Sequence, residues 1–226
     1  MHPRQKELFK HIVEEYIKAA LPVGSKLIVE KFNWDISPAT IRNDMMELEN
    51  AELIFQPHTS AGRVPTEFGY KKYVIENVDL AKMISEKDKN DFLRIIENYE
   101  SGSTEKIKQL AKILAEKSGL SAVVGFQDND VYYTGLSNLF SQPEFQDLNL
   151  VCNLSVVIDH LDEAMQNIYG KIDKEVMIKI GAENPFAHDC AAVLVKIKNI
   201  LIGIVGPMRM NYQKNAELIN FAKNIL

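Results

Sequence analysis

SPATIRNDMMELEN, residues 37–50, is the stretch that decides the fold of the N-terminal part of this chain. Ser37 is a favourable N-cap residue, and Pro38 suits the first position of a helix, where its missing N–H group costs no hydrogen bond. A helix is therefore predicted over residues 38–52. Its buried side falls within roughly 60° of rotation at the helical period and consists of Ile41, Met45 and Leu48.

Two helical patterns precede this helix. Apolar residues follow one stripe over residues 4–20, and Pro22 and Gly24 end that pattern. Ser25 is predicted to cap a second helix over residues 25–32, which a tight turn connects to the third. Two short helices, a turn and a third helix are the order of a helix-turn-helix. The inward side of the second helix is predicted to be Leu27, Ile28, Val29 and Phe32.

A hairpin pattern follows the third helix. Residues 53–56 are typical of a strand, PHTSAG at 57–62 is rich in turn-forming residues, and 63–65 are predicted to return as a second strand. A further helix is predicted to begin at Thr66 or Glu67. Because a hairpin beside a recognition helix forms a wing, residues 1–78 are predicted to be a winged helix-turn-helix DNA-binding domain.

The remainder of the chain has a different pattern. Residues 79–119 are predicted to be a helical linker, with a capping box at Ser85 and a C-terminal Gly119. From residue 120 strand patterns join helical ones, so 120–226 are predicted to form a separate α+β domain. The predicted elements are strands at 121–126, 131–134, 176–180, 191–197 and 200–205, a turn at Asp128-Asn129-Asp130, a helical stretch over 136–170 and a helix over 212–226.

The composition is that of an ordinary globular protein, with 46% apolar and 25% charged residues. No apolar run is long enough for a transmembrane helix and no secretory segment is recognised, so a cytoplasmic protein without a membrane partner is expected. Cys152 and Cys190 are far apart and fit reduced core residues. The net charge is −5, and residues 1–78 hold ten Lys and Arg against eleven Asp and Glu. DNA binding would therefore depend on the local placement of cations.

The polar face of the 38–52 helix is predicted to contact DNA bases. Ala39, Asn43 and Met46 point away from its buried side, and the N-terminal part of a recognition helix enters the major groove. An asparagine can pair with adenine, an arginine with guanine, and an alanine can touch a thymine methyl group. The alternative is a merely solvated face, which the preceding helix and turn and the following wing make less favourable. The predicted DNA-binding set is Lys26, Ser37, Ala39, Thr40, Arg42, Asn43, Met46, His58, Thr59, Ser60, Arg63, Lys71 and Lys72.

Part of this set is predicted to contact phosphate. Ser37, Thr40 and the free N–H groups of the first helical turn suit a phosphate group. The wing tip is small and polar, and Arg63 is predicted to reach a phosphate or a narrow minor groove from it. Lys71 and Lys72 are either further phosphate contacts or solvated surface charges. No cofactor or metal is expected, because no second His or Cys stands near His58 at ligand spacing.

Several segments resemble the HrcA family, whose members are repressors of bacterial heat-shock chaperone operons. Together they are spread over most of the chain, from residue 22 to residue 212, and the N-terminal match is long, nearly ungapped and specific. The N-terminal ones are PVGSK at 22–26, SPATIRNDM at 37–45, QPHTSAGRVPT at 56–66 and GY at 69–70. The C-terminal ones are GLSNLFSQPEF at 135–145, IGAENP at 180–185 and GPMRMNY at 206–212.

The resemblance implies a function as well as a fold. It implies a winged-helix domain, a GAF-like regulatory and dimerisation domain, and homodimers that bind an inverted-repeat operator called CIRCE on double-stranded DNA. It also implies a chaperonin as modulator, with derepression when unfolded proteins occupy that chaperonin. Family members carry a long inserted dimerisation segment between the strand at 121–126 and GLSNL, which is reduced here to one short strand and a turn. Self-association is therefore expected through helices at 85–118 or through the GAF-like sheet.

Three alternatives differ in class from this repressor. A one-component regulator would bind a small molecule in its C-terminal domain and recognise a different operator. A protein-interaction module would bind the chaperonin without a DNA function. An enzyme is not expected, because the sequence has no nucleophile elbow, phosphate loop or zinc spacing. The candidates weighed for chemistry were Asp159, His160, Asp162 and Glu163, and then His188, Asp189 and Cys190.

Overall fold

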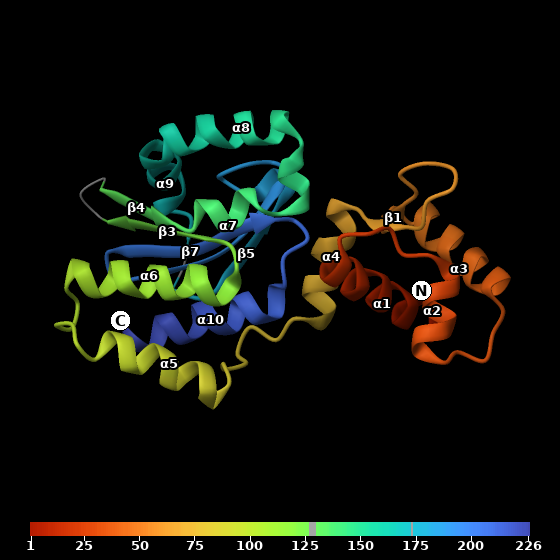
Figure 1. Ribbon diagram of the computed structural model, residues 1–226, viewed down its shortest axis with the longest axis horizontal. Coiled ribbons are helices and arrows are strands. Elements are labelled where there is room, and N and C mark those ends of the chain that lie inside the picture. The colour runs from red at the N-terminus through yellow and green to blue at the C-terminus, as the bar shows by residue number, and fades with distance from the viewer. Residues whose placement is uncertain (127–129, 173) are drawn as a thin grey trace. The chain divides into compact units, whose positions relative to one another are not determined.

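The computed structural model describes residues 1–126, 130–172 and 174–226, the side chain of Ile95 excepted. Of the expected turn at Asp128-Asn129-Asp130, the first two residues lie outside this description. The chain divides into two compact units, Met1–Val78 and Asp79–Leu226, each of which is described by itself (Figure 1).

The first unit is a helix-turn-helix followed by a short hairpin. Its elements are α1 (Pro3–Ala19), α2 (Ser25–Phe32), α3 (Pro38–Asn50), β1 (Ile54–Phe55), β2 (Val64–Pro65) and α4 (Glu67–Asn77). Ile54 pairs with Pro65 and Phe55 with Val64, which confirms the predicted hairpin. The α3 helix ends at Asn50, two residues earlier than predicted, because the backbone turns into the left-handed region at Glu52 (φ 58°).

The predicted cap of α3 is confirmed, whereas that of α2 is wrong. The Ser37 hydroxyl accepts a hydrogen bond from the Thr40 N–H group at 3.1 Å. In α2 the N-cap residue is Gly24, and Ser25 is already helical and buried. Of the four residues predicted to face inward from α2, Ile28 alone is fully buried. Leu27 is 43% exposed, because an eight-residue helix lying on α3 presents only a narrow face to the core.

A close approach of two backbone segments holds the wing against the rest of this unit. The Val23 N–H group donates to the Arg63 carbonyl and the Arg63 N–H group to the Val23 carbonyl, both at 2.9 Å. A Cβ atom at Gly62 would lie 2.4 Å from the Val23 carbonyl carbon. Because no side chain fits at that distance, glycine is required at residue 62.

His11 joins α1 to the end of α2 and the turn that follows. Its ring stacks on Phe32 with centroids 3.5 Å apart and lies 5.8 Å from the Trp34 ring. The side chain is 15% exposed, and its Nδ1 atom is buried without a hydrogen-bond partner. Burial lowers the pKa of His11 below its ordinary 6.5, although the charges of Glu7 and Glu14 oppose that shift.

The second unit is built on a five-stranded antiparallel sheet with the order β4-β3-β7-β6-β5. This sheet and its helices confirm the predicted α+β class and all five predicted strands. The strands are β3 (Ser121–Phe126), β4 (Val131–Thr134), β5 (Met177–Ile180), β6 (Cys190–Ile197) and β7 (Ile200–Pro207). The β6–β7 hairpin pairs from Cys190–Pro207 to Ile197–Ile200 and turns at Lys198, which adopts a left-handed backbone.

Helices cover both faces of this sheet (Figure 1). One face is covered by α6 (Thr104–Ser118) and α10 (Tyr212–Ile225), and α5 (Glu86–Ile96) packs on this pair. The other side holds α7 (Leu136–Phe140), α8 (Leu148–Asp159) and α9 (Leu161–Tyr169), with short 3₁₀ turns at Pro143–Gln146 and Gly181–Glu183. Residues 79–119, expected to be a linker, therefore belong to the second unit, because their helices bury apolar sides against the sheet and α10.

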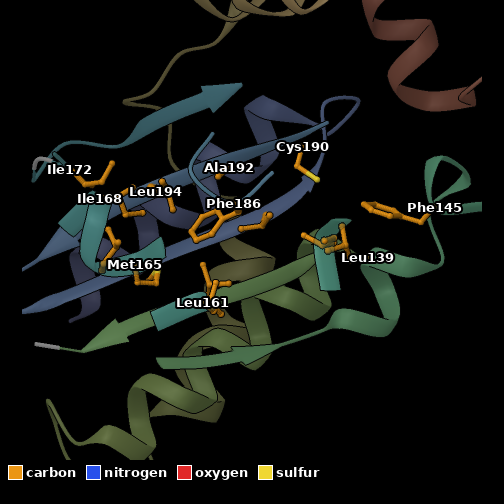
Figure 2. Close-up of a cluster of buried hydrophobic side chains, with 14 residues drawn as sticks. Leu139, Phe145, Leu161, Met165, Ile168, Ile172, Phe186, Cys190, Ala192 and Leu194 are labelled. Carbon is orange, nitrogen blue, oxygen red and sulfur yellow. The ribbon is translucent and has the colours of Figure 1, made fainter. Parts of the chain in front are cut away.

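The core between the sheet and α7–α9 is filled by side chains (Figure 2). Phe186 and Leu194 lie at its centre, facing Leu139, Leu161 and Met165. The cavity left beneath α8 has a volume of about 20 Å³. That is enough for about one water molecule.

An ion pair connects two of the family-like segments in this unit. Arg209 lies in GPMRMNY, and Glu144 lies in GLSNLFSQPEF. The Arg209 Nε atom lies 2.6 Å from Glu144 Oε1, and Nη2 lies 3.1 Å from both Glu144 Oε2 and Gln142 Oε1. The guanidinium, only 11% exposed, thereby fixes the segment that leads into α8 to the end of β7. Within the described ranges, no helix combines the length and apolar character needed to cross a membrane.

We predict that Gly62→Ala destabilises the first unit by about 1–3 kcal/mol, the usual cost of inserting a group into a filled space. Thermal unfolding of the whole chain, followed by the fluorescence of Trp34, measures this because Trp34 is the single tryptophan. The matched control is Gly24→Ala, because a Cβ atom at Gly24 meets nothing within 4 Å. Equal melting temperatures for the two variants would contradict the close approach at Gly62.

A second prediction concerns the stability of the first unit at acidic pH. Because the pKa of His11 is lowered in the folded state, unfolding takes up a proton as the pH falls below 6.5. Above pH 6.5 the titration of His11 therefore does not reduce the free energy of unfolding of the first unit. Below pH 6.5 this free energy decreases until the pH reaches the pKa of His11 in the folded state. We expect His11→Phe, which retains a ring beside Phe32 and cannot titrate, to reduce the pH dependence between 7 and about 5. Urea unfolding at several pH values, observed through Trp34, tests this, and parallel pH profiles for the two proteins would refute it.

Candidate nucleic-acid interface

The outer face of α3 is formed by the residues that its helical period predicts. Ala39, Arg42, Asn43 and Met46 are all exposed, and the exposed fraction of Met46 is 55%. Thr40 is half-buried, and its hydroxyl lies 3.0 Å from that of Ser37. The first turn of α3 therefore presents two hydroxyl groups, with the exposed side chains of Arg42, Asn43 and Met46 behind them along the helix.

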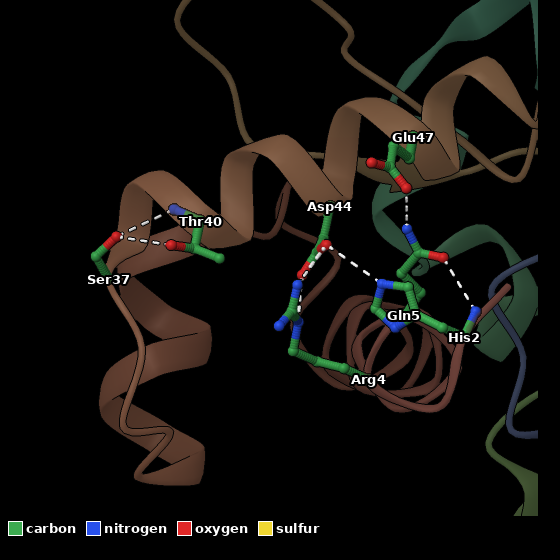
Figure 3. A network of polar contacts seen from close by, with 7 residues as sticks. All are labelled: His2, Arg4, Gln5, Ser37, Thr40, Asp44 and Glu47. Carbon is green, nitrogen blue, oxygen red and sulfur yellow. Dashed lines mark hydrogen bonds and ion pairs between the residues drawn. The ribbon is translucent and has the colours of Figure 1, made fainter.

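A polar network fixes the opposite side of α3 against α1 (Figure 3). Arg4 of α1 binds Asp44 of α3 through two hydrogen bonds, Nε to Oδ2 at 2.7 Å and Nη2 to Oδ1 at 3.0 Å. The hydrogen bond to Asp44 raises the pKa of Arg4 above its ordinary value. Gln5 donates a third hydrogen bond across the interface, to Glu47. These contacts determine the rotation of α3 about its axis.

Asp44 is a positioning residue that the sequence analysis missed. It is 4% exposed and lies on the same side of α3 as Ile41, Met45 and Leu48. The spacing 41, 44, 45, 48 is that of a helix face, so the period alone identifies position 44 as inward. A carboxylate at such a position requires a cation or hydrogen-bond donors, and Arg4 supplies both.

A groove of about 520 Å³ runs between the start of α2, the outer side of α3 and the wing. Lys26 and Arg42 line it, together with the polar wing residues Thr59 and Ser60. The N-cap residue of α2, Gly24, has no side chain to accept the N–H groups of the first turn. Those N–H groups and the positive end of the helix dipole favour an anion at this end of the groove.

Lys26 and Arg42 differ from the other predicted cations. Among the residues that the structure describes, neither has an ion-pair partner, and both are exposed. Their charges are therefore available to an anion without the loss of an internal ion pair. Arg63 lines the same groove, but its charge is paired with Glu49.

Arg63 lies elsewhere than the sequence analysis expected. Its Nη2 and Nε atoms both lie 3.1 Å from Glu49 Oε2, and the side chain is 14% exposed. It thus connects the base of the wing to α3 and does not project from the wing tip. The exposed tip is His58, Thr59 and Ser60, where Gln56 holds the loop by donating to the Thr59 and Ala61 carbonyls at 2.9 Å.

The two lysines of α4 are also engaged in ion pairs. Lys71 lies 2.8 Å from Glu67, and Lys72 lies 2.9 Å from Glu76. Both pairs have the i, i+4 spacing of neighbours on one helix surface. Three of the five predicted cations line the groove: Lys26, Arg42 and Arg63. The charges of Arg63, Lys71 and Lys72 are each paired with a nearby carboxylate.

The residues weighed for chemistry do not form a reactive site. Cys190 is buried, and burial, followed by the charges of Asp189 and Glu144, raises the pKa of its thiol to about 12. His160 is exposed and lies 3.7 Å from Glu163. In the described part of the chain, no three His, Cys, Asp or Glu side chains gather as a metal site would require.

Comparisons with known proteins agree with this architecture. The family model described as the HrcA protein C-terminal domain matches residues 76–215. The crystal structure of a hypothetical protein at 2.2 Å superposes with a TM-score of 0.78 and 19% identity, and covers 99% of this chain and 97% of that one. This second similarity concerns the fold alone.

Two relatives named heat-inducible transcription repressor HrcA show how the chain compares in length. The protein from Desulfitobacterium hafniense is 25% identical over 334 positions, which cover 100% of this chain and 96% of that protein. Because this chain has 226 residues, at least 108 of those positions have no counterpart in it. The protein from Thermomicrobium roseum is 40% identical over 119 residues, 51% of this chain but only 33% of that protein.

The family match is broad as well as specific. It extends over 140 of the 226 residues, includes the whole GPMRMNY segment and ends inside α10. It includes the Arg209–Glu144 ion pair and all five strands of the second unit. The chain belongs to the HrcA family.

Proposed function

We propose that this protein is a cytoplasmic transcription repressor of heat-shock chaperone operons, which binds an inverted-repeat operator of the CIRCE type. The observation that carries the proposal is the groove of the first unit, where the exposed face of α3 adjoins two unpaired cations, Lys26 and Arg42. The relatives' name, heat-inducible transcription repressor, supports the same function.

In this proposal α3 enters the major groove with its N-terminal half. Asn43 pairs with an adenine, Arg42 with a guanine, and Ala39 and Met46 contact apolar base edges such as a thymine methyl group. The Arg4–Asp44 contact holds the helix so that these side chains face the bases. Binding therefore requires little rearrangement of α3, which limits the entropy lost on recognition.

Phosphate contacts come from both sides of α3. The first turn of α2 with Lys26 takes one phosphate, and the hydroxyls of Ser37 and Thr40 take another. His58, Thr59 and Ser60 at the wing tip follow the backbone. Arg63, Lys71 and Lys72 contribute less, because each must first exchange an internal carboxylate for a phosphate.

The inverted repeat requires two copies of this first unit, so the repressor acts as a homodimer. A chaperonin modulates it, and occupation of that chaperonin by unfolded proteins relieves repression. The competing function, a sensor of small molecules, has less support. Cavities in the second unit have volumes of about 20 Å³ beneath α8, 170 Å³ between β3, β4 and α9, and 290 Å³ beside α9 and β5. Ligand pockets begin at about 300 Å³, so the last of these lies at the lower limit and the others well below it.

We expect Asn43→Ala to lower the affinity for the full operator by about 1–3 kcal/mol and to relax base preference at one position of each half-site. The loss of base preference is confined to one position because Asn43 contacts the edge of a single adenine in each half-site. Fluorescence anisotropy on a CIRCE duplex, duplexes substituted at single positions and a scrambled duplex measures both effects. The control is Asn50→Ala, which removes an exposed amide from the far end of α3; similar profiles for both variants would exclude the proposed contact.

Lys26→Ala is expected to weaken binding evenly across sequences and to reduce the slope of log K against log salt by roughly 1 per half-site, because one phosphate neutralisation is lost. Lys72→Ala is expected to change the slope less, because Lys72 is already neutralised by Glu76. Anisotropy titrations over a series of salt concentrations distinguish the two. A larger effect at Lys72 than at Lys26 would place the DNA on a different face of the first unit.

A further inference from the structure

The α8 helix exposes an apolar face. Of its twelve residues only Leu154 is buried, whereas Leu148 is 76% exposed and Val156 is 61% exposed. Cys152 between them is exposed as well. Figure 1 shows α8 on the outer margin of the second unit. Apolar side chains exposed in a row on one helix mark a contact surface far more often than isolated ones do.

The apolar residues of this face are arranged symmetrically about Cys152 along the helix. Leu148, Cys152 and Val156 are spaced by four residues and form a stripe about 12 Å long. At 100° per residue, Cys152 points about 160° away from Leu154, almost opposite the core-facing side. The apolar residues that precede and follow Cys152 stand at equal distances from it. Such a stripe matches a copy of itself when the two helices run antiparallel, with Leu148 of one copy opposite Val156 of the other.

The distribution of charge favours the same partner. Residues 148–158 contain no Asp, Glu, Lys or Arg, although a quarter of the chain is charged. A neutral face suits a second copy of a protein whose net charge is −5, because it avoids like-charge repulsion at the contact. Asp147 and Asp159 are the charges that flank this face, one at each end of α8. An antiparallel pair places the opposite ends of the two helix dipoles side by side, whereas a parallel pair would bring like ends together.

We propose that two copies of this chain associate through α8, antiparallel about a two-fold axis at Cys152. Helices α5 and α6, where self-association was first expected, bury their apolar sides within their own unit, at Phe92, Ile107 and Leu110 among others. The α8 face is free of such internal packing. Closed two-fold contacts of this kind use the same surface on both copies, as the symmetry of the stripe requires.

The size of the surface determines the strength of the contact. Two helices of three turns bury well under the about 1,200 Å² of a stable specific interface. The dimer is therefore weak in free solution and becomes populated when two first units occupy adjacent half-sites, which raises the effective concentration of one copy for the other. Only this last step depends on the proposed function, and the contact at α8 can be tested without DNA.

Cross-linking through Cys152 tests the contact directly. The full chain is treated with a short bismaleimide over about a hundredfold range of protein concentration, so that even a weak dimer is sampled. Cys190 is buried and stays unreactive, so Cys152 is the one exposed thiol. We expect a covalent dimer whose yield rises with concentration and that Cys152→Ser abolishes. Sedimentation velocity on the untreated protein is expected to show the same concentration dependence.

Charged variants decide whether α8 forms the contact. Leu148→Glu with Val156→Glu is expected to lower the cross-linked fraction and raise the dimer dissociation constant at least about tenfold, because two buried apolar contacts per copy are lost. Ile75→Glu, at an 83% exposed position of α4, is the matched control and should leave both unchanged. Absence of any cross-link in a protein that sediments as a monomer throughout overturns the proposal. So does a cross-link that survives the double variant.

DNA binding separates this inference from the proposed function. The double α8 variant should bind a CIRCE half-site as the original chain does, while losing most of the preference for the full repeat. If the original chain binds none of the duplexes above its affinity for a scrambled one, the proposed function fails and cross-linking still decides the α8 contact. If the double variant retains full preference for the repeat, dimerisation on DNA uses another surface and the proposal is overturned.

Discussion

The rotation of α3 about its own axis is the constraint on which the candidate interface depends. One side of α3 packs into the core through Ile41, Met45 and Leu48. Asp44 on that side is buried and binds Arg4 of α1 in a two-point contact with a fixed orientation. A helix anchored by both packing and a directional ion pair presents one defined set of side chains to solvent. That set includes Ala39, Arg42, Asn43 and Met46.

Local ion pairing explains how a nearly neutral domain offers a positive site. Glu49, Glu67 and Glu76 are bound by Arg63, Lys71 and Lys72, so these carboxylates leave little negative charge free near the interface. Lys26 and Arg42 remain unpaired among the described residues and share one groove. The field that an approaching phosphate meets depends on these nearby groups more than on the sum of charges, since screening limits longer-range interactions to about 10 Å.

Residues in and next to the family-like segments stabilise the second unit. Arg209 and Glu144 come from different segments and form one ion pair that fixes the approach to α8. Phe186, which directly follows IGAENP (180–185), lies in the centre of the core. These residues therefore have structural roles.

Local patterns along the chain were enough to predict the elements and the family. Capping at Ser37 and the period of α3 act between residues a few positions apart, so local reasoning was sufficient for the helix and its outer face. Runs of β-branched residues gave all five strands, and the motifs gave the family. Tertiary structure alone decided the pairing of Arg63 with Glu49, the inclusion of α5 and α6 in the second unit, and the exposure of Leu148 and Val156. Each of these depends on which groups from distant parts of the chain arrive at the same place, and a periodic pattern specifies a face without specifying what covers it.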